Sequence, residues 1–134
     1  MPSDRPGTGR HILWAEDNPQ DRMLIDDAAE GVAPAPDLTL VADGVLLLEA
    51  LEAEVPALVV LDLKMPRLGG LETLRRMRGH ADWRGLPVII FSSGNRPEEI
   101  DECRALGAAN VVQKPVDFDL FSSAVQDIVR AAQP

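Results

Sequence analysis

An apolar run at residues 57–66 constrains the fold more than any other stretch of this chain. It reads Ala-Leu-Val-Val-Leu-Asp-Leu-Lys-Met-Pro and contains one acid, Asp62. A continuous aliphatic run rich in valine predicts a strand buried on both faces of a parallel sheet, because covering helices remove the need for polar alternation. Asp62 then stands at the carboxyl end of the strand, where open α/β sheets bind ligands. A carboxylate buried there needs a cation or another partner.

Strand and helix patterns alternate five times along the chain. Strands are predicted at residues 11–15, 38–42, 57–62, 86–91 and 111–112, with helices beginning near residues 19, 45, 71, 97 and 117. This alternation predicts an α/β fold with a doubly wound, five-stranded parallel sheet in the order 2-1-3-4-5. Residues 10–134 are expected to form a single domain with no output domain. Residues 1–9, which hold two prolines and two glycines, are expected to be a flexible tail.

Composition narrows the classes of function. The net charge of −9 argues against nonspecific binding to nucleic acid or to an anionic membrane. The sequence has neither an apolar run of about 18 residues nor the apolar core of a signal peptide. A single cysteine, Cys103, cannot form an internal disulfide and is expected to be a small apolar helix residue. We therefore expect a cytoplasmic protein.

Polar residues follow the predicted strands at the points where the strands end. They are Glu16 and Asp17, Asp62, Ser92, and Lys114. In the predicted strand order these ends meet at one edge of the sheet, so three carboxylates converge and repel one another. A hard divalent cation with oxygen ligands, Mg²⁺ first of all, relieves that repulsion.

The chemistry that this set can support is narrow. An aspartate carboxylate can attack phosphorus and form an aspartyl phosphate. Catalysis of that step consists mainly of positioning and of neutralising charge on the phosphoryl oxygens, which suits Mg²⁺, a lysine and a hydroxyl donor. Asp62, Lys114 and Ser92 supply these groups together with the metal.

With these residues in this order, the chain resembles the receiver domains of two-component response regulators, over about residues 10–132. The resemblance rests on Glu16-Asp17, on Asp62 in Asp-Leu-Lys-Met-Pro, on Gly70, on Ser92 and on Lys114-Pro115. It implies the flavodoxin-like (βα)5 receiver fold. It also implies that the protein accepts a phosphoryl group from a sensor histidine kinase and signals by a conformational or oligomeric change.

The resemblance also implies a role for each site residue. Asp62 would be the phosphoacceptor, Ser92 would hydrogen-bond the phosphoryl group, and Lys114 would pair with it. The Mg²⁺ ion would be bound by Asp17, by Asp62, by the backbone carbonyl of Lys64 and, through water, by Glu16. The Lys114–Pro115 peptide bond would be cis, as is usual in the family. One departure is Val111, at a position that is usually aromatic, which puts aromatic switching in doubt.

A finer resemblance is to stand-alone regulators paired with bacterial phytochromes. It rests on residues 16–21, 78–87, 92–94 and 114–119. It implies a homodimer through the fourth helix, the fifth strand and the fifth helix, a surface to which Phe118 could belong. Phe121 is expected in the core instead.

Two alternatives belong to other classes of protein. A phosphohydrolase of the haloacid dehalogenase type would carry a second aspartate two residues after the first, where this chain has Lys64. An FMN-binding flavodoxin would need a phosphate-cradling loop after the first strand, which the sequence lacks. Simpler interpretations apply to other residues. Trp14, Leu74 and Ile128 are expected in the core, acids of the first helix on a solvated face, and His11 and His80 on the surface without metal-ligand partners.

Overall fold

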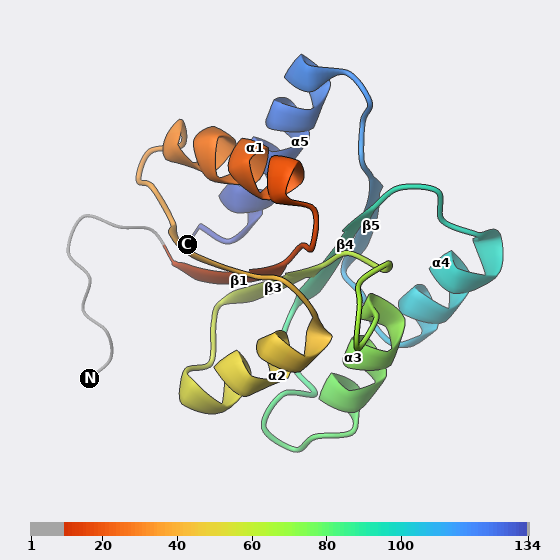
Figure 1. Ribbon diagram of the computed structural model, residues 1–134. Helices are drawn as coiled ribbons and strands as arrows, with labels where there is room; N and C mark the ends of the chain where they lie inside the picture. The colour runs from red at the N-terminus through yellow and green to blue at the C-terminus, as the bar shows by residue number, and fades with distance from the viewer. Residues whose placement is uncertain (1–9, 134) are drawn as a thin grey trace.

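The computed structural model describes residues 10–133 and confirms the α/β architecture (Figure 1). Five parallel strands form one sheet in the predicted order, β2-β1-β3-β4-β5. The strands are β1 (His11–Ala15), β2 (Asp37–Val41), β3 (Leu58–Leu61), β4 (Val88–Ser92) and β5 (Asn110–Gln113). The helices are α1 (Pro19–Glu30), α2 (Gly44–Ala53), α3 (Gly70–Arg78), α4 (Pro97–Ala105) and α5 (Phe118–Ala131).

The helices cover the sheet in two layers, with α1 and α5 on one face and α2, α3 and α4 on the other (Figure 1). The core under α1 and α5 contains an aromatic series. The rings of Trp14 and Phe91 lie 5.7 Å apart edge to face, and those of Phe91 and Phe121 lie 5.3 Å apart. The predicted core residues Trp14, Leu74, Phe121 and Ile128 are all buried.

Local sequence signals set the boundaries of these elements. Asn18 caps α1, where its side chain accepts a hydrogen bond from the N–H of Asp21. Strand β4 begins at Val88, two residues later than predicted, because Pro87 has no N–H to donate to a neighbouring strand. The strand continues to Ser92, so this hydroxyl belongs to the last residue of a buried strand.

The Lys114–Pro115 bond departs from the family pattern. Among residues 10–133 the cis peptide bond is Ala33–Pro34, so the predicted cis bond at Lys114–Pro115 is wrong. The trans form is the lower in free energy for most bonds to proline. The expectation of a flexible tail at residues 1–9 lies outside the described residues.

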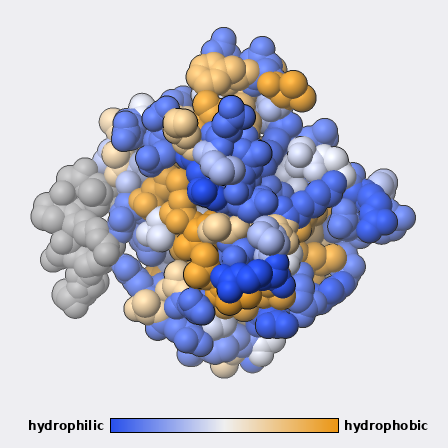
Figure 2. Space-filling model, in the orientation of Figure 1, coloured by the Kyte–Doolittle hydropathy of each residue, from blue (hydrophilic) through white to orange (hydrophobic). Residues whose placement is uncertain are grey.

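Hydrophilic side chains cover most of the face shown in Figure 2, and a hydrophobic band crosses its middle between the two helical layers. Exposed apolar side chains gather near the start of α5, where Val116, Phe118 and Leu120 are open to solvent. Within residues 10–133, none of the helices has the length and apolar character that a membrane span requires.

Candidate functional site

Backbone pairing brings the polar residues to one edge of the sheet. The N–H of Asp62 donates to the carbonyl of Ala15 at 3.2 Å, which sets Asp62 beside Glu16. The N–H of Lys114 likewise donates to the carbonyl of Ser92 at 2.9 Å. The strand order alone therefore assembles residues that lie far apart in the sequence.

Hydrogen bonds hold both oxygens of the carboxylate of Asp62, a residue that is buried. Its Oδ1 accepts from the Ser92 hydroxyl at 2.7 Å and from the N–H of Lys64 at 3.2 Å. Its Oδ2 accepts from the Lys114 ammonium at 2.7 Å. Because the Ser92 oxygen also accepts from the N–H of Leu63 at 3.3 Å, the orientation of the hydroxyl is fixed. The carboxylate is thus positioned before any ligand binds.

The Lys114 ammonium contacts three carboxylates at once. Its Nζ lies 2.7 Å from Asp62, 2.7 Å from Glu16 and 2.9 Å from Asp21. Burial by itself lowers the pKa of Lys114, but the bonds to Asp62, Glu16 and Asp21 outweigh it and raise the pKa above its ordinary value. Lys114 is therefore a fixed positive charge at neutral pH.

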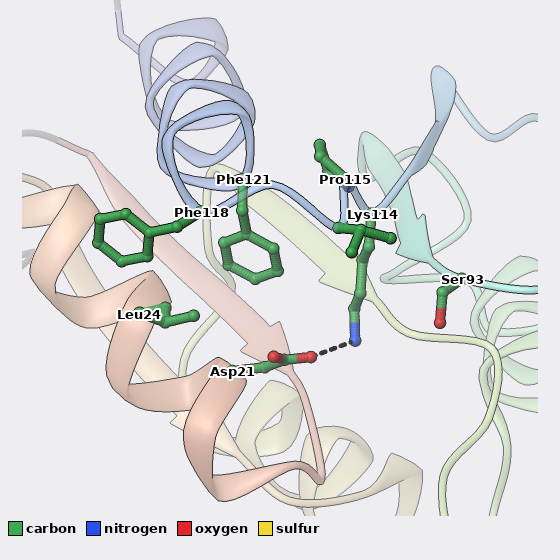
Figure 3. Close-up of a pocket in the computed structure, with 8 residues that line it drawn as sticks. Asp21, Leu24, Ser93, Lys114, Pro115, Phe118 and Phe121 are labelled. Atoms are coloured by element: carbon green, nitrogen blue, oxygen red, sulfur yellow. Dashed lines mark hydrogen bonds and ion pairs between the residues drawn. The ribbon is translucent and has the colours of Figure 1, made fainter.

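Asp21 corrects the prediction that the acids of the first helix form a solvated face. It lies in the first turn of α1, which begins directly beside the site. Figure 3 shows the Asp21 carboxylate pointing from α1 toward Lys114, with which it pairs. The signal was present in the sequence, since an acid in the first turn of a helix that starts at the carboxyl edge can point back to that edge.

Glu16 is fully buried, and its burial, Lys114 and Asp62 together shift its pKa. Burial raises the pKa of Glu16 to about 7, with the Lys114 contact lowering it and repulsion from Asp62 raising it. Its Oε2 accepts from the N–H of Asn18 at 3.2 Å. Its Oε1 is buried and pairs with the Lys114 ammonium at 2.7 Å.

The acidic group fits a divalent cation. Oxygens of Glu16, Asp17 and Asp62 lie within 4.8 Å of one another, and Asp17 is the most open to solvent of the three. Three carboxylates contact the Lys114 ammonium, and Asp17 adds a fourth beside Glu16 and Asp62, so the negative charge of this group exceeds the charge of that ammonium. Carboxylate oxygens are the ligands that Mg²⁺ prefers, and a partly open site leaves it water ligands.

Lys64 lies in the loop that follows β3. Its N–H donates to Asp62, and its ammonium donates to the carbonyl of Gly94 at 3.3 Å. Neither contact uses the carbonyl of Lys64, so the role of that carbonyl as a metal ligand stays a prediction.

Gly70 allows the backbone to approach Asp62 closely. A Cβ at Gly70 would lie 2.2 Å from the backbone carbonyl oxygen of Asp62, a distance that no side chain tolerates. The N–H of Gly70 also donates to the carbonyl of Leu63 at 3.0 Å. The glycine eight positions after Asp62 is therefore a steric requirement of the loop that follows the site.

An ion pair that the sequence did not reveal braces the same loop. Arg67 has a positive φ of 64°, and its Nε lies 2.9 Å from the buried carboxylate of Asp43, the N-cap of α2. The Asp43 carboxylate also accepts from the N–H of Leu46 at 2.9 Å. The pair ties the loop after β3 to the start of α2.

A second polar group lies at the amino ends of the strands, which form the edge of the sheet opposite the candidate site. His11 is half-buried, its Nδ1 lies 3.8 Å from Glu54, and its Nε2 is 3.0 Å from the hydroxyl of Thr39. Ligand atoms of His11, Asp37 and Glu54 lie within 4.8 Å of one another. The prediction that His11 lacks neighbours at metal-ligand distance is therefore wrong, because pairing of β1 with β2 sets Asp37 beside it.

Comparison with known proteins identifies the class. Residues 12–126 match the response regulator receiver domain, and the chain belongs to that family. This membership favours the signalling receiver over the phosphohydrolase and the FMN-binding protein.

Curated relatives agree with this family membership. The two-component response regulator ARR16 of Arabidopsis thaliana is 31% identical over 118 residues, which cover 79% of this chain and 72% of that protein. The Regulator of RpoS of Escherichia coli K12 is 34% identical over 112 residues, which cover 84% of this chain and 32% of that protein. The chain spans about a third of the length of the first curated relatives it matches.

Solved structures share the fold. The phosphorylated cyanobacterial phytochrome response regulator RcpA superposes with a TM-score of 0.85 over 90% of this chain and 91% of its own, at 23% identity. The response regulator RPA3017 in red light signalling of R. palustris gives a TM-score of 0.77 over 88% of this chain and 90% of its own, at 27% identity. Regulators of light signalling are thus among the structural neighbours.

Proposed function

We propose that this chain accepts a phosphoryl group on Asp62 from the phosphohistidine of a sensor histidine kinase, in a reaction that requires Mg²⁺. The observation that carries the proposal is the Asp62 carboxylate, held at 2.7 Å by both Ser92 and Lys114 beside Glu16 and Asp17. A lone strand-end aspartate would need none of these partners.

In the proposed reaction a carboxylate oxygen of Asp62 attacks phosphorus. The new P–O bond forms as the P–N bond to the donor imidazole breaks, and the imidazole nitrogen leaves with the electron pair of that bond. The Lys114 ammonium and the Ser92 hydroxyl donate to the phosphoryl oxygens as charge develops on them. Asp17, Asp62, the carbonyl of Lys64 and, through water, Glu16 would hold the Mg²⁺ ion, which would supply the remaining neutralisation of charge.

The kinase partner is proposed from the family and its neighbours. Receiver domains take phosphoryl groups from histidine kinases, and RPA3017 acts in red light signalling. A bacterial phytochrome is therefore our first candidate for the donor.

The output is proposed to be a conformational or oligomeric change. The Ser92 hydroxyl, which donates a hydrogen bond to Asp62 in the unmodified protein, would turn to the phosphoryl group. The packing of the neighbouring strand β5 would then change. Val111 in β5 is half-buried against the aliphatic core, so an aliphatic side chain would repack there. Strand β5 is an edge strand, and a cavity of about 210 Å³ lies beside it, lined by residues of β4, β5 and α5 that include Val112, Ala124 and Ile128. These features support a homodimer through α4, β5 and α5.

Intact mass after incubation with acetyl phosphate tests the phosphoacceptor. We expect one phosphoryl adduct on the native protein with Mg²⁺, none with EDTA, and none on Asp62→Asn. Asp26 is exposed on α1, and Asp26→Asn removes one negative charge, as Asp62→Asn does. This control variant should form the adduct as the native protein does. An adduct on Asp62→Asn would refute the assignment. A sizing column run on each sample would show whether the adduct changes the oligomeric state.

A further inference from the structure

The partners of Lys114 differ in how easily the ammonium could release them. The side chains of Glu16 and Asp62 are 1% and 8% exposed, whereas that of Asp21 is 24% exposed. A buried carboxylate left without its partner is strongly destabilising. A carboxylate that can turn to water is released at much lower cost. Asp21 is thus the partner that Lys114 can give up.

Asp21 and Lys114 also lie together at the wall of a cavity. A cavity of about 310 Å³ opens beside Lys114 and is lined by residues of α1 and of the segment from Lys114 to Phe121. In Figure 3 the Asp21 carboxylate and the Lys114 ammonium meet at this cavity, with Phe118 and Phe121 projecting beside Leu24. The Asp21–Lys114 pair therefore faces open space, where the Asp21 carboxylate can turn to water when the ammonium leaves it.

The number of N–H donors on the Lys114 ammonium limits how many anionic groups it can bind at once. An ammonium has three N–H donors, and Glu16, Asp21 and Asp62 each lie within 2.9 Å of the nitrogen. A phosphoryl group on Asp62 adds oxygens that need the same donors. One of the present contacts must then be exchanged, and exposure singles out the contact with Asp21.

We propose that Asp21 is the exchangeable counter-ion of Lys114: it holds the ammonium while Asp62 is unmodified and yields it to the phosphoryl group. This inference rests on the proposed phosphorylation of Asp62. Asp21 is a positioning residue in this scheme, since it acts through Lys114. By competing for the ammonium, its carboxylate limits how tightly the site holds a phosphoryl group.

Beryllofluoride, a stable anionic analogue of the phosphoryl group, tests the exchange. Its affinity at saturating Mg²⁺ and the affinity for Mg²⁺ alone would be measured by calorimetry on the native protein, Asp21→Asn, Asp21→Glu and Asp27→Asn. Asp27 is an exposed acid on the same helix and controls for the loss of one charge. We expect Asp21→Asn to bind beryllofluoride roughly three- to tenfold more tightly, because a nearby negative charge and a competitor for Lys114 are removed.

The same variant should bind Mg²⁺ with unchanged or slightly weaker affinity, since it loses a negative charge near the metal. Asp21→Glu should resemble the native protein, and Asp27→Asn should change neither affinity. Weaker binding of both ligands by Asp21→Asn would indicate a merely structural role and overturn the proposal. An equal gain in Asp27→Asn would overturn it too, since the effect would then be one of overall charge.

Nuclear magnetic resonance of the Lys114 side chain separates this inference from the proposed function. In the metal-free protein, the hydrogens of the Lys114 ammonium should exchange with water faster in Asp21→Asn and not in Asp27→Asn. Unchanged exchange would overturn the role of Asp21 even if the native protein binds beryllofluoride. Faster exchange without any beryllofluoride binding by the native protein would confirm the ion pair, and would overturn both the phosphoacceptor role and the exchange.

Discussion

The two edges of the sheet carry charged groups in different ways. At the carboxyl edge, the side chains of Glu16, Asp62 and Lys114 are almost wholly buried, and the Lys114 ammonium lies 2.7 Å from each carboxylate. At the amino edge, His11 and Glu54 stay partly exposed, and the Nδ1 atom of His11 lies 3.8 Å from the Glu54 carboxylate. Burial of charge is costly unless every group is paired, whereas an exposed pair costs and contributes little. The carboxyl edge therefore keeps an arrangement that folding alone would not favour, which agrees with a site built for chemistry.

Of the changes at either edge, removal of the Lys114 side chain should lower the free energy of unfolding most. Lys114→Ala leaves Glu16 and Asp62 buried without their cation, and the free energy of unfolding of the metal-free protein should fall by about 3–5 kcal/mol. Added Mg²⁺ should recover part of the loss, because a cation again neutralises the carboxylates. Urea unfolding with EDTA and with Mg²⁺ measures both. A loss below about 1 kcal/mol, as is usual for exposed pairs, would contradict the comparison.

The pH dependence of stability should reveal the raised pKa of Glu16. Its pKa in the folded protein is about 7, against 4.5 for the ordinary group, so between these pH values the folded state binds more protons than the unfolded state. Without divalent cations, this group should therefore lower the free energy of unfolding as pH rises from 4.5 to 7, by up to about 3 kcal/mol.

The measurement is urea unfolding at several pH values in EDTA, for the native protein and for Glu16→Gln. The difference between the two isolates the Glu16 contribution from those of the other acids. Parallel stability curves would show that Glu16 titrates in its ordinary range.

Gly70 and Gly85, at opposite ends of the strands, differ in the space that is open to a Cβ. Gly70→Ala at the carboxyl edge would place a Cβ 2.2 Å from the Asp62 carbonyl oxygen, whereas a Cβ at Gly85, in the loop before β4, would meet no atom within 4 Å. We expect Gly70→Ala to lower the free energy of unfolding by about 1–3 kcal/mol and to weaken Mg²⁺ binding. Gly85→Ala should be neutral or slightly stabilising. Thermal unfolding and Mg²⁺ titration of both variants test this, and equal effects would contradict the close approach at Gly70.

The smallest effect is expected at the amino edge. Glu54→Gln removes a charge from a side chain that is 39% exposed, so the free energy of unfolding should change by less than about 1 kcal/mol. Phosphorylation by acetyl phosphate should be unchanged, because the residue lies at the far edge of the sheet. A change in adduct formation without a change in stability would show that the two edges are coupled.

Much of the fold and of the site could be predicted because the signals are local. The buried run before Asp62 and the polar residues that end four strands follow from periodicity along the chain. The parallel order then needs only the rule that strand ends of one kind share an edge. Glu16, Asp17, Asp62, Ser92 and Lys114 lie together as predicted.

Other features depended on how the elements pack. Asp21 and Lys114 are 93 positions apart, and their contact exists because α1 docks with its first turn beside the segment that follows β5. The pairing of Arg67 with Asp43, and the approach of His11 to Glu54, likewise join segments that no sequence spacing relates.

The sequence by itself thus determined the strands, their polar ends and the set of groups that we propose to accept a phosphoryl group. Only the tertiary structure decided which carboxylates share the Lys114 ammonium and which of them stays open to water. The physical reason is that periodicity fixes the face on which a side chain lies, whereas its partner and its exposure depend on the distance and orientation between packed elements.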